Sequence, residues 1–167
     1  AGRAQAVVPF ASNKLCLTVR SDVMHVGDDW RVLLNRTDLR LATSTAGCDP
    51  SGDYTQELFN RMGVEGHAAR QRALALVGGR NSALIPTGTL AAQWVIESGQ
   101  AEMFIGYASY ANTLRQTEGL TVLAIPEPFN PHAQYALAVL TPKAQRLAEF
   151  IQSKEAKVIL LEAGFGV

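Results

Sequence analysis

Small and hydroxyl-bearing residues gather where a predicted strand runs into a predicted helix, over residues 43–54. Ser51 brings a hydroxyl to the start of the helix, Gly52 leaves the backbone open to a ligand, and Pro50 fixes φ where no donor is needed. A helix N-terminus at the carboxyl edge of an α/β sheet offers backbone amides to an anion. The segment predicts an anion-binding site. The alternative is an ordinary helix N-cap, in which the negative charge of Asp53 is stabilised by the helix dipole.

A second segment of the same kind lies at residues 85–89. Thr87 and Thr89 flank Gly88 there, directly before a predicted amphipathic helix over residues 90–98. The backbone amides of such a turn can form a second anion-binding site. A plain cap by either threonine is the alternative.

The third segment ends a predicted apolar strand over residues 103–107. Tyr107 and Ser109 leave the carboxyl end of this strand and carry neutral hydroxyl donors. The alternative for Tyr107 is a core residue with a solvated hydroxyl. Because all three segments occur in one small domain, we expect Ser51, Thr89 and Tyr107 to meet in one cleft.

Enzyme motifs are missing from the sequence. It contains no GxxxxGK[ST], GxSxG, HExxH or CxxC pattern. Cys48 precedes a helix, but a phosphatase-type loop needs an arginine six residues later, where Tyr54 stands. The three histidines are scattered, with no acidic partners that would suggest a metal site. We therefore expect no catalytic residue, no metal site and no cofactor, and keep an enzyme of another type as a third hypothesis.

The composition is that of one globular domain. The chain has 167 residues, of which 47% are hydrophobic, and its 15 Lys and Arg balance 15 Asp and Glu. No basic surface for nucleic acid is expected, and no apolar run reaches the roughly 20 residues of a membrane span. Cys16 and Cys48 are compatible with one disulfide or with two buried thiols.

Hydrophobic periodicity predicts alternating strands and helices, which favours an α/β fold with a mostly parallel sheet. The predicted strands are residues 13–19, 39–43, 103–107, 120–125 and 135–140. The predicted helices are a short one after Asp28 and Asp29, then residues 51–62, 68–77, 90–98, one beginning at Pro142 after Thr141, and one capped by Ser153 that runs to Leu161.

The order of several short motifs resembles the molybdate-binding proteins of ABC importers, which are type II periplasmic solute-binding proteins. The motifs are Phe10, Ala11, Asn13 and Leu15; residues 49–54; residues 95–99 with Ala101; Ile105, Gly106, Tyr107 and Ser109; Tyr135; and Gly164 with Phe165. The resemblance spans nearly the whole chain. Residues 49–54 and the region of Tyr107 carry most of it.

The resemblance implies two lobes joined by crossing strands, with the ligand in the cleft between them. It implies a three-layer αβα lobe, an outward crossing strand at residues 13–19 and a returning one at 135–140. Residues 1–12 would be the remnant of the first lobe, and residues 13–140 the second lobe with its crossing strands. Residues 141–167 would be helices that pack toward the first lobe.

The resemblance also implies the ligand, its donors and the partner. A tetrahedral oxyanion, molybdate or tungstate, would be held by the backbone amide of Ser51, by Thr89 and by the hydroxyl of Tyr107, with Ser109 as a further candidate. The protein would act in the bacterial periplasm, or lipid-anchored outside the cell membrane, and deliver its ligand to an ABC transporter permease. The competing hypothesis is an oxyanion or small-ligand sensor domain of a cytoplasmic transcription regulator.

Two departures from the family pattern stand out. Nothing before Asn13 supplies the first strand and the serine-rich loop of the first lobe, so this lobe is expected to be incomplete and the site to be half of a shell. Exposed strand edges would then allow self-association. Tyr110 also stands where the family often has an aspartate after the serine, which bears on ligand identity.

Overall fold

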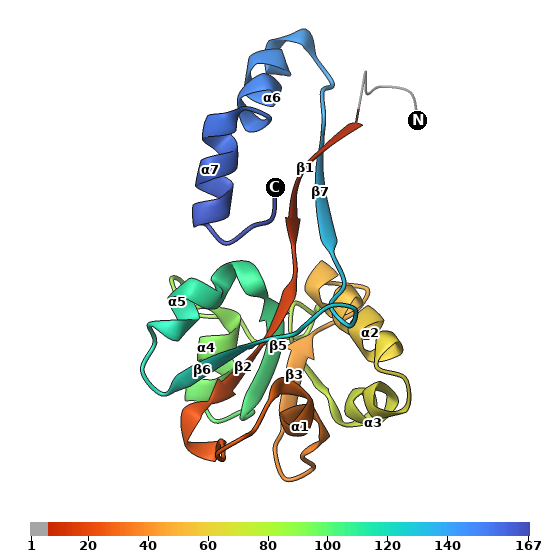
Figure 1. Cartoon of the computed structure of the whole chain (residues 1–167), viewed down its shortest axis with the longest axis vertical. Helices are drawn as coiled ribbons and strands as arrows, with labels where there is room; N and C mark the ends of the chain where they lie inside the picture. The colour runs from red at the N-terminus through yellow and green to blue at the C-terminus, as the bar shows by residue number, and fades with distance from the viewer. Residues whose placement is uncertain (1–6) are drawn as a thin grey trace.

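The computed structural model describes residues 7–167, which form a five-stranded sheet, a two-stranded ribbon and surrounding helices (Figure 1). The sheet has the strand order β4, β3, β5, β2, β6. The strands are β2 (Leu15–Arg20), β3 (Leu41–Ser44), β4 (Leu74–Val77), β5 (Met103–Tyr107) and β6 (Leu120–Ala124). β3 pairs in parallel with β4 and β5, whereas β2 pairs antiparallel with β5 and β6. Four strands therefore share one direction and β2 alone is reversed, which agrees with the mostly parallel sheet that was expected.

Helices cover both faces of this sheet and make the lobe three layers thick. On one face lie α1 (Trp30–Asn35), α2 (Pro50–Arg61) and α3 (Val64–Arg72), and on the other lie α4 (Ala91–Glu97) and α5 (Ala111–Arg115). Short 3-10 turns occupy η1 (Ser21–Val23), η2 (Ala108–Tyr110) and η3 (Pro142–Ala144). The side chains of β2 alternate between the two layers: Leu17 packs in the core with α1, α2 and α3, and Cys16 packs with α4 and α5.

A long antiparallel ribbon connects this lobe to the last two helices. It consists of β1 (Val7–Asn13) and β7 (Ala133–Ala138), with an irregularity between Pro9 and Ala11. α6 (Gln145–Ile151) and α7 (Lys154–Glu162) follow the ribbon and stand apart from the lobe (Figure 1). The ribbon thus carries α6 and α7 away from the sheet, and the turn after α7 returns to η2, where Gly164 lies against Ser109.

The structure corrects two of the predicted elements. Residues 68–77 are not one helix, because α3 ends at Arg72 and residues 74–77 form β4 beside β3. Residues 13–19 are not one strand, because β1 ends at Asn13 and a separate strand, β2, begins at Leu15, so the strand of the ribbon is β1. Of the expected first-lobe remnant at residues 1–12, residues 1–6 lie outside the described part of the chain.

Asn130 fixes the point where the chain passes from the ribbon into the sheet. Its side chain is 1% exposed. The Oδ1 atom accepts the backbone N–H of Leu15 at 2.8 Å, and Nδ2 donates to the carbonyls of Leu15 and Ile125, each at 2.8 Å. One buried amide therefore satisfies three backbone groups that β2 and β6 leave unpaired.

We expect Asn130→Ala to lower the free energy of unfolding by about 3 kcal/mol, because it leaves buried backbone groups without partners. Chemical denaturation would measure this change. Asn112→Ala, which alters an exposed amide on α5, is the matched control and should change stability by less than about 0.5 kcal/mol. Equal small effects in both variants would contradict this role of Asn130.

Candidate functional site

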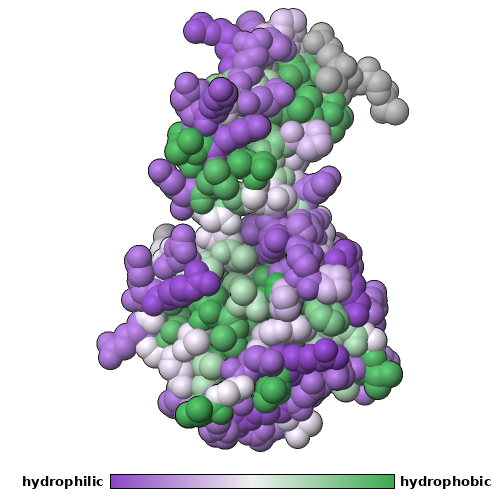
Figure 2. Space-filling view, viewed as in Figure 1, coloured by the Kyte–Doolittle hydropathy of each residue, from purple (hydrophilic) through white to green (hydrophobic). Residues whose placement is uncertain are grey.

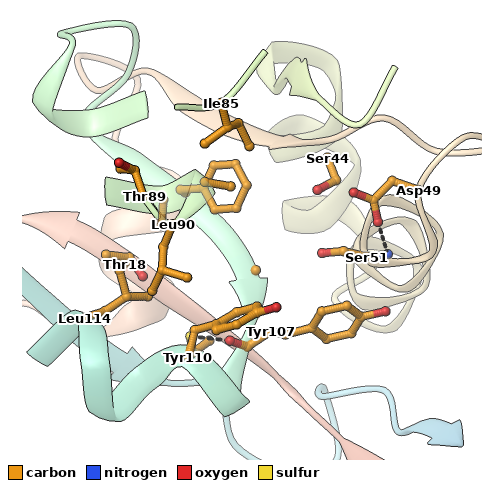
Figure 3. Close-up of a pocket in the computed structure, with 15 residues that line it drawn as sticks. Thr18, Ser44, Asp49, Ser51, Ile85, Thr89, Leu90, Tyr107, Tyr110 and Leu114 are labelled. Atoms are coloured by element: carbon orange, nitrogen blue, oxygen red, sulfur yellow. Dashed lines mark hydrogen bonds between the residues drawn. The ribbon is translucent and has the colours of Figure 1, made fainter. Parts of the chain in front are cut away.

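A cavity of about 360 Å³ lies at the carboxyl ends of β3 and β5 (Figure 3). The first residues of β2, the N-terminus of α2, the loop before α4, and α5 complete its walls. Its lining residues are Cys16, Thr18, Ser44, Asp49, Ser51, Ile85, Thr89, Leu90, Ala91, Ala92, Phe104, Gly106, Tyr107, Tyr110 and Leu114. The cavity therefore occupies the edge of the sheet at which α/β folds bind their ligands.

Local interactions hold the first turn of α2 tightly at this edge. Asp49 is the N-cap, and its Oδ1 accepts the backbone N–H of Ser51 at 2.9 Å. The Asp53 carboxylate accepts the N–H of Gly47 at 2.7 Å. A Cβ atom on Gly52 would lie 2.7 Å from the Ser44 carbonyl oxygen, so only glycine allows the helix to approach the end of β3 this closely.

Ser51 contributes its hydroxyl to the cavity and not its backbone amide. The residue is 5% exposed, and its Oγ has no hydrogen-bond partner within residues 7–167. Its N–H, which was expected to face the anion, is already taken by Asp49. The next amide, that of Gly52, donates to the Asp49 carbonyl oxygen at 2.9 Å. A buried hydroxyl without a partner is costly, and a ligand oxygen in the cavity would satisfy it.

Tyr107 closes the same side of the cavity from β5. Its side chain extends toward Asp49 and Ser51 (Figure 3). Burial raises the pKa of the Tyr107 hydroxyl, and the nearby Tyr135, Asp49 and Tyr54 raise that pKa further. The phenol therefore stays protonated at physiological pH and is available as a neutral donor.

The other two expected donors differ from each other. Thr89 lines the cavity on the side opposite Ser51, although α4 begins at Ala91 and its N-cap is Leu90 (Figure 3). Ser109 is not part of the lining. Its Oγ accepts the side-chain amide of Asn13 at 2.9 Å, which holds the start of η2 against the ribbon. The structure thus brings Ser51, Thr89 and Tyr107 to one cavity and places Ser109 beside the end of β1.

Sequence reasoning missed the apolar wall and the acidic group of this cavity. Phe104 and Leu114, both nearly fully buried, form the wall together with Ile85 and Leu90. Their alternating or helical spacing is what any core residue shows, so the sequence gives no signal of a cavity there. Asp49 did carry a signal, because an aspartate before a proline at a helix start is a typical cap.

The cavity holds few ionisable groups. Within residues 7–167, neither a Lys nor an Arg lines it, and no group of three His, Cys, Asp or Glu could bind a metal. Cys16 is a free thiol whose pKa is raised to about 11 by burial, and Cys48 is free and exposed. Asp49 is therefore the carboxylate in a site otherwise made of hydroxyls, a thiol and apolar groups.

Comparison with known proteins gives a family profile and one sequence relative. The profile of the bacterial extracellular solute-binding proteins matches residues 1–166. An uncharacterised protein of Pasteurella multocida is 44% identical over 149 residues, which are 86% of this chain and 61% of that protein. The chain thus spans less than two thirds of the length of this relative.

Solved structures share the fold at low sequence identity. The periplasmic molybdate-binding protein of Azotobacter vinelandii matches with a TM-score of 0.69 and 17% identity, over 98% of this chain and 68% of that one. Peb3 of Campylobacter jejuni matches with a TM-score of 0.70 and 15% identity, over 99% of this chain and 71% of that one. Another structure of Peb3 contains bound L-phospholactate. These likenesses confirm the type II periplasmic binding fold.

The unpaired hydroxyl of Ser51 leads to a prediction about stability that can be tested without a ligand. We expect Ser51→Ala to leave the free energy of unfolding unchanged or to raise it by up to about 1 kcal/mol, because it removes a buried polar atom that has no partner. Thr55→Val is the matched variant, since the Thr55 hydroxyl is buried in the same helix and donates to the Ser51 carbonyl at 2.8 Å. It should lose about 1 kcal/mol. Equal losses in thermal or urea denaturation would show that the Ser51 hydroxyl has an internal partner.

Proposed function

Because the chain belongs to the bacterial extracellular solute-binding protein family, we propose that it is the substrate-binding component of an ABC importer and binds a tetrahedral oxyanion. The buried hydroxyl of Ser51, which has no partner and lies at the N-terminus of α2, is the observation that carries this proposal. Tyr107 and Thr89 supply further neutral donors in the same cavity. Molybdate and tungstate are the ions that the family resemblance implies.

Neutral donors suit the reversible binding of an ion. Hydroxyls and the positive end of the α2 dipole stabilise negative charge without forming a salt bridge that would slow release. Inside a closed cleft each of these hydrogen bonds is stronger than in water, because the effective dielectric constant is lower. The absence of Lys and Arg from the described lining is therefore compatible with an anionic ligand.

Family membership supports a place outside the cytoplasm and a role in binding. None of the helices within residues 7–167 is long and apolar enough to cross a membrane. We propose the periplasm, or a lipid anchor on the outer side of the cell membrane, as the location. An ABC transporter permease is the proposed partner.

A second candidate ligand is an oxyanion group carried by an organic molecule. The cavity volume falls in the range of small-molecule sites, and an apolar wall of Phe104, Leu114 and Ile85 faces its hydroxyls. A bare ion would leave its acceptor oxygens unpaired against that wall, whereas a carbon skeleton would fill it. The L-phospholactate bound to Peb3 is a ligand of this kind in a protein of the same fold.

We expect Tyr107→Phe to weaken the binding of the tetrahedral oxyanion that binds best in a panel of molybdate, tungstate, sulfate and phosphate. One charge-assisted hydrogen bond of about 1.5–3 kcal/mol would be lost. Isothermal titration calorimetry on the natural full-length protein would measure the loss. Unliganded melting temperatures should coincide, and unchanged affinity would remove Tyr107 from the site.

We also propose that α6 and α7 pack against a further part of the natural protein. Leu147, Phe150, Ile159 and Leu161 on these helices are each more than half exposed, and Figure 2 shows apolar surface there. The match to this chain covers only 61% of the Pasteurella relative, so that relative has further residues against which such helices can pack. The cavity would then be one wall of a cleft between two lobes.

Residues 1–167 alone are therefore expected to bind the same oxyanion only weakly. Donors on an open surface replace hydrogen bonds to water at high dielectric, and salt screens what remains. Parallel titrations of these residues and of the natural full-length protein would test this. Submicromolar affinity for a monomer of residues 1–167 would show that one wall suffices.

A further inference from the structure

The carboxylate of Asp49 lines the cavity next to the proposed anion donors. Its Oδ1 holds the Ser51 amide, whereas its Oδ2 lies beside Gly78, where a Cβ atom would stand 2.6 Å from it, and accepts none of the hydrogen bonds found within residues 7–167. No salt bridge within these residues involves Asp49. Asp49 and Tyr107 line the same cavity, and the charge of Asp49 is one of the lesser causes, after burial and Tyr135, that raise the pKa of the Tyr107 hydroxyl. The site therefore combines hydroxyl donors with one acceptor that bears a negative charge.

This combination has a direct consequence for the ligand. A fully ionised oxyanion such as sulfate or molybdate presents only acceptors, so Asp49 would repel it at short range without any compensating hydrogen bond. An oxyanion that retains a proton can turn that proton toward the carboxylate. The contact then becomes a short, charge-assisted O–H···O hydrogen bond.

Asp49 also occupies the place that the anion was expected to take. The Ser51 amide at the helix N-terminus donates to this carboxylate and not to the cavity. An incoming oxyanion would have to share the site with it, because the helix N-terminus is already neutralised in part by a negative group. A dianion without a proton is therefore stabilised less in this site than an oxyanion that can donate a hydrogen bond to Asp49.

We propose that Asp49 is a specificity-determining residue that selects an oxyanion ligand carrying a proton, or another hydrogen-bond donor, next to its ionised oxygens. The inference rests on the proposed oxyanion site and narrows its ligand. Hydrogen phosphate and organic molecules with a hydroxyl beside a phosphate or carboxylate belong to the selected class. Sulfate, molybdate and tungstate at neutral pH do not.

Inorganic phosphate and sulfate are the probes that isolate this effect. The two ions are similar in shape, and at pH 7 phosphate keeps at least one proton whereas sulfate keeps none. Asp49→Asn removes the charge and retains an N-cap that can accept the Ser51 amide, so the first turn of α2 should stay folded. Calorimetric titrations of the natural full-length protein and of this variant, with phosphate, sulfate and molybdate, give the comparison.

We expect the parent to prefer phosphate over sulfate by at least tenfold, and Asp49→Asn to lose that preference through tighter sulfate and molybdate binding and weaker phosphate binding. Glu57→Gln is the matched control, because it removes one negative charge from the same helix at a residue that does not line the cavity; its preference should equal that of the parent. Equal affinity of the parent for phosphate and sulfate, or an unchanged preference in Asp49→Asn, would overturn the role of Asp49 and leave the oxyanion site standing. Binding of none of the three ions by the parent would overturn both the oxyanion site and this inference.

Discussion

The first turn of α2 lies so close to the end of β3 that residue 52 has no room for a side chain. A Cβ atom there would stand 2.5 Å from the backbone nitrogen of Ala46, and Asp49 completes the junction by capping the helix. This close contact between α2 and β3 fixes the position of the Ser51 hydroxyl in the cavity. Tyr107 then reaches the same place because β5 pairs with β3 in parallel, so both strands end at one edge. The geometry of the cavity follows from this one close contact between helix and strand.

The two ends of β5 differ in the charge of the side chains around them. At the amino end of β5, Glu102 is 8% exposed and accepts the Arg40 amide at 2.8 Å, and its hydrogen bond with the Arg40 guanidinium lowers its pKa. At the carboxyl end, burial raises the pKa of Tyr107 and the donors remain neutral. Paired charges therefore stabilise the edge that only has to hold the fold together. The cavity at the opposite edge has neither a Lys nor an Arg among its described lining residues.

Sequence patterns predicted the elements whose signals are local. Residues 103–107 form an apolar run after a glycine-terminated helix, and β5 has these bounds. Residues 74–77 are equally apolar but fit a helix or a strand, and only pairing with β3 decides between them. The site followed the same rule: hydroxyls at predicted helix starts indicated Ser51 and Thr89, and a hydroxyl at a strand end indicated Tyr107. The position of Ser109, in contrast, depends on Asn13, 96 residues away. The loss of the Ser51 amide to Asp49 is a matter of side-chain geometry that composition does not encode.

The reversed strand β2 sets the order in which this chain can fold. β2 is the first strand of the sheet in sequence, yet its neighbours on both sides are residues 103–107 and 120–124. Contacts of such large sequence separation form late and slow the folding reaction. Until β5 and β6 have been synthesised, β2 has no neighbouring strand with which to pair. The sheet is therefore complete only once the chain has been synthesised beyond residue 124, and until then the apolar residues of β2 are open to aggregation.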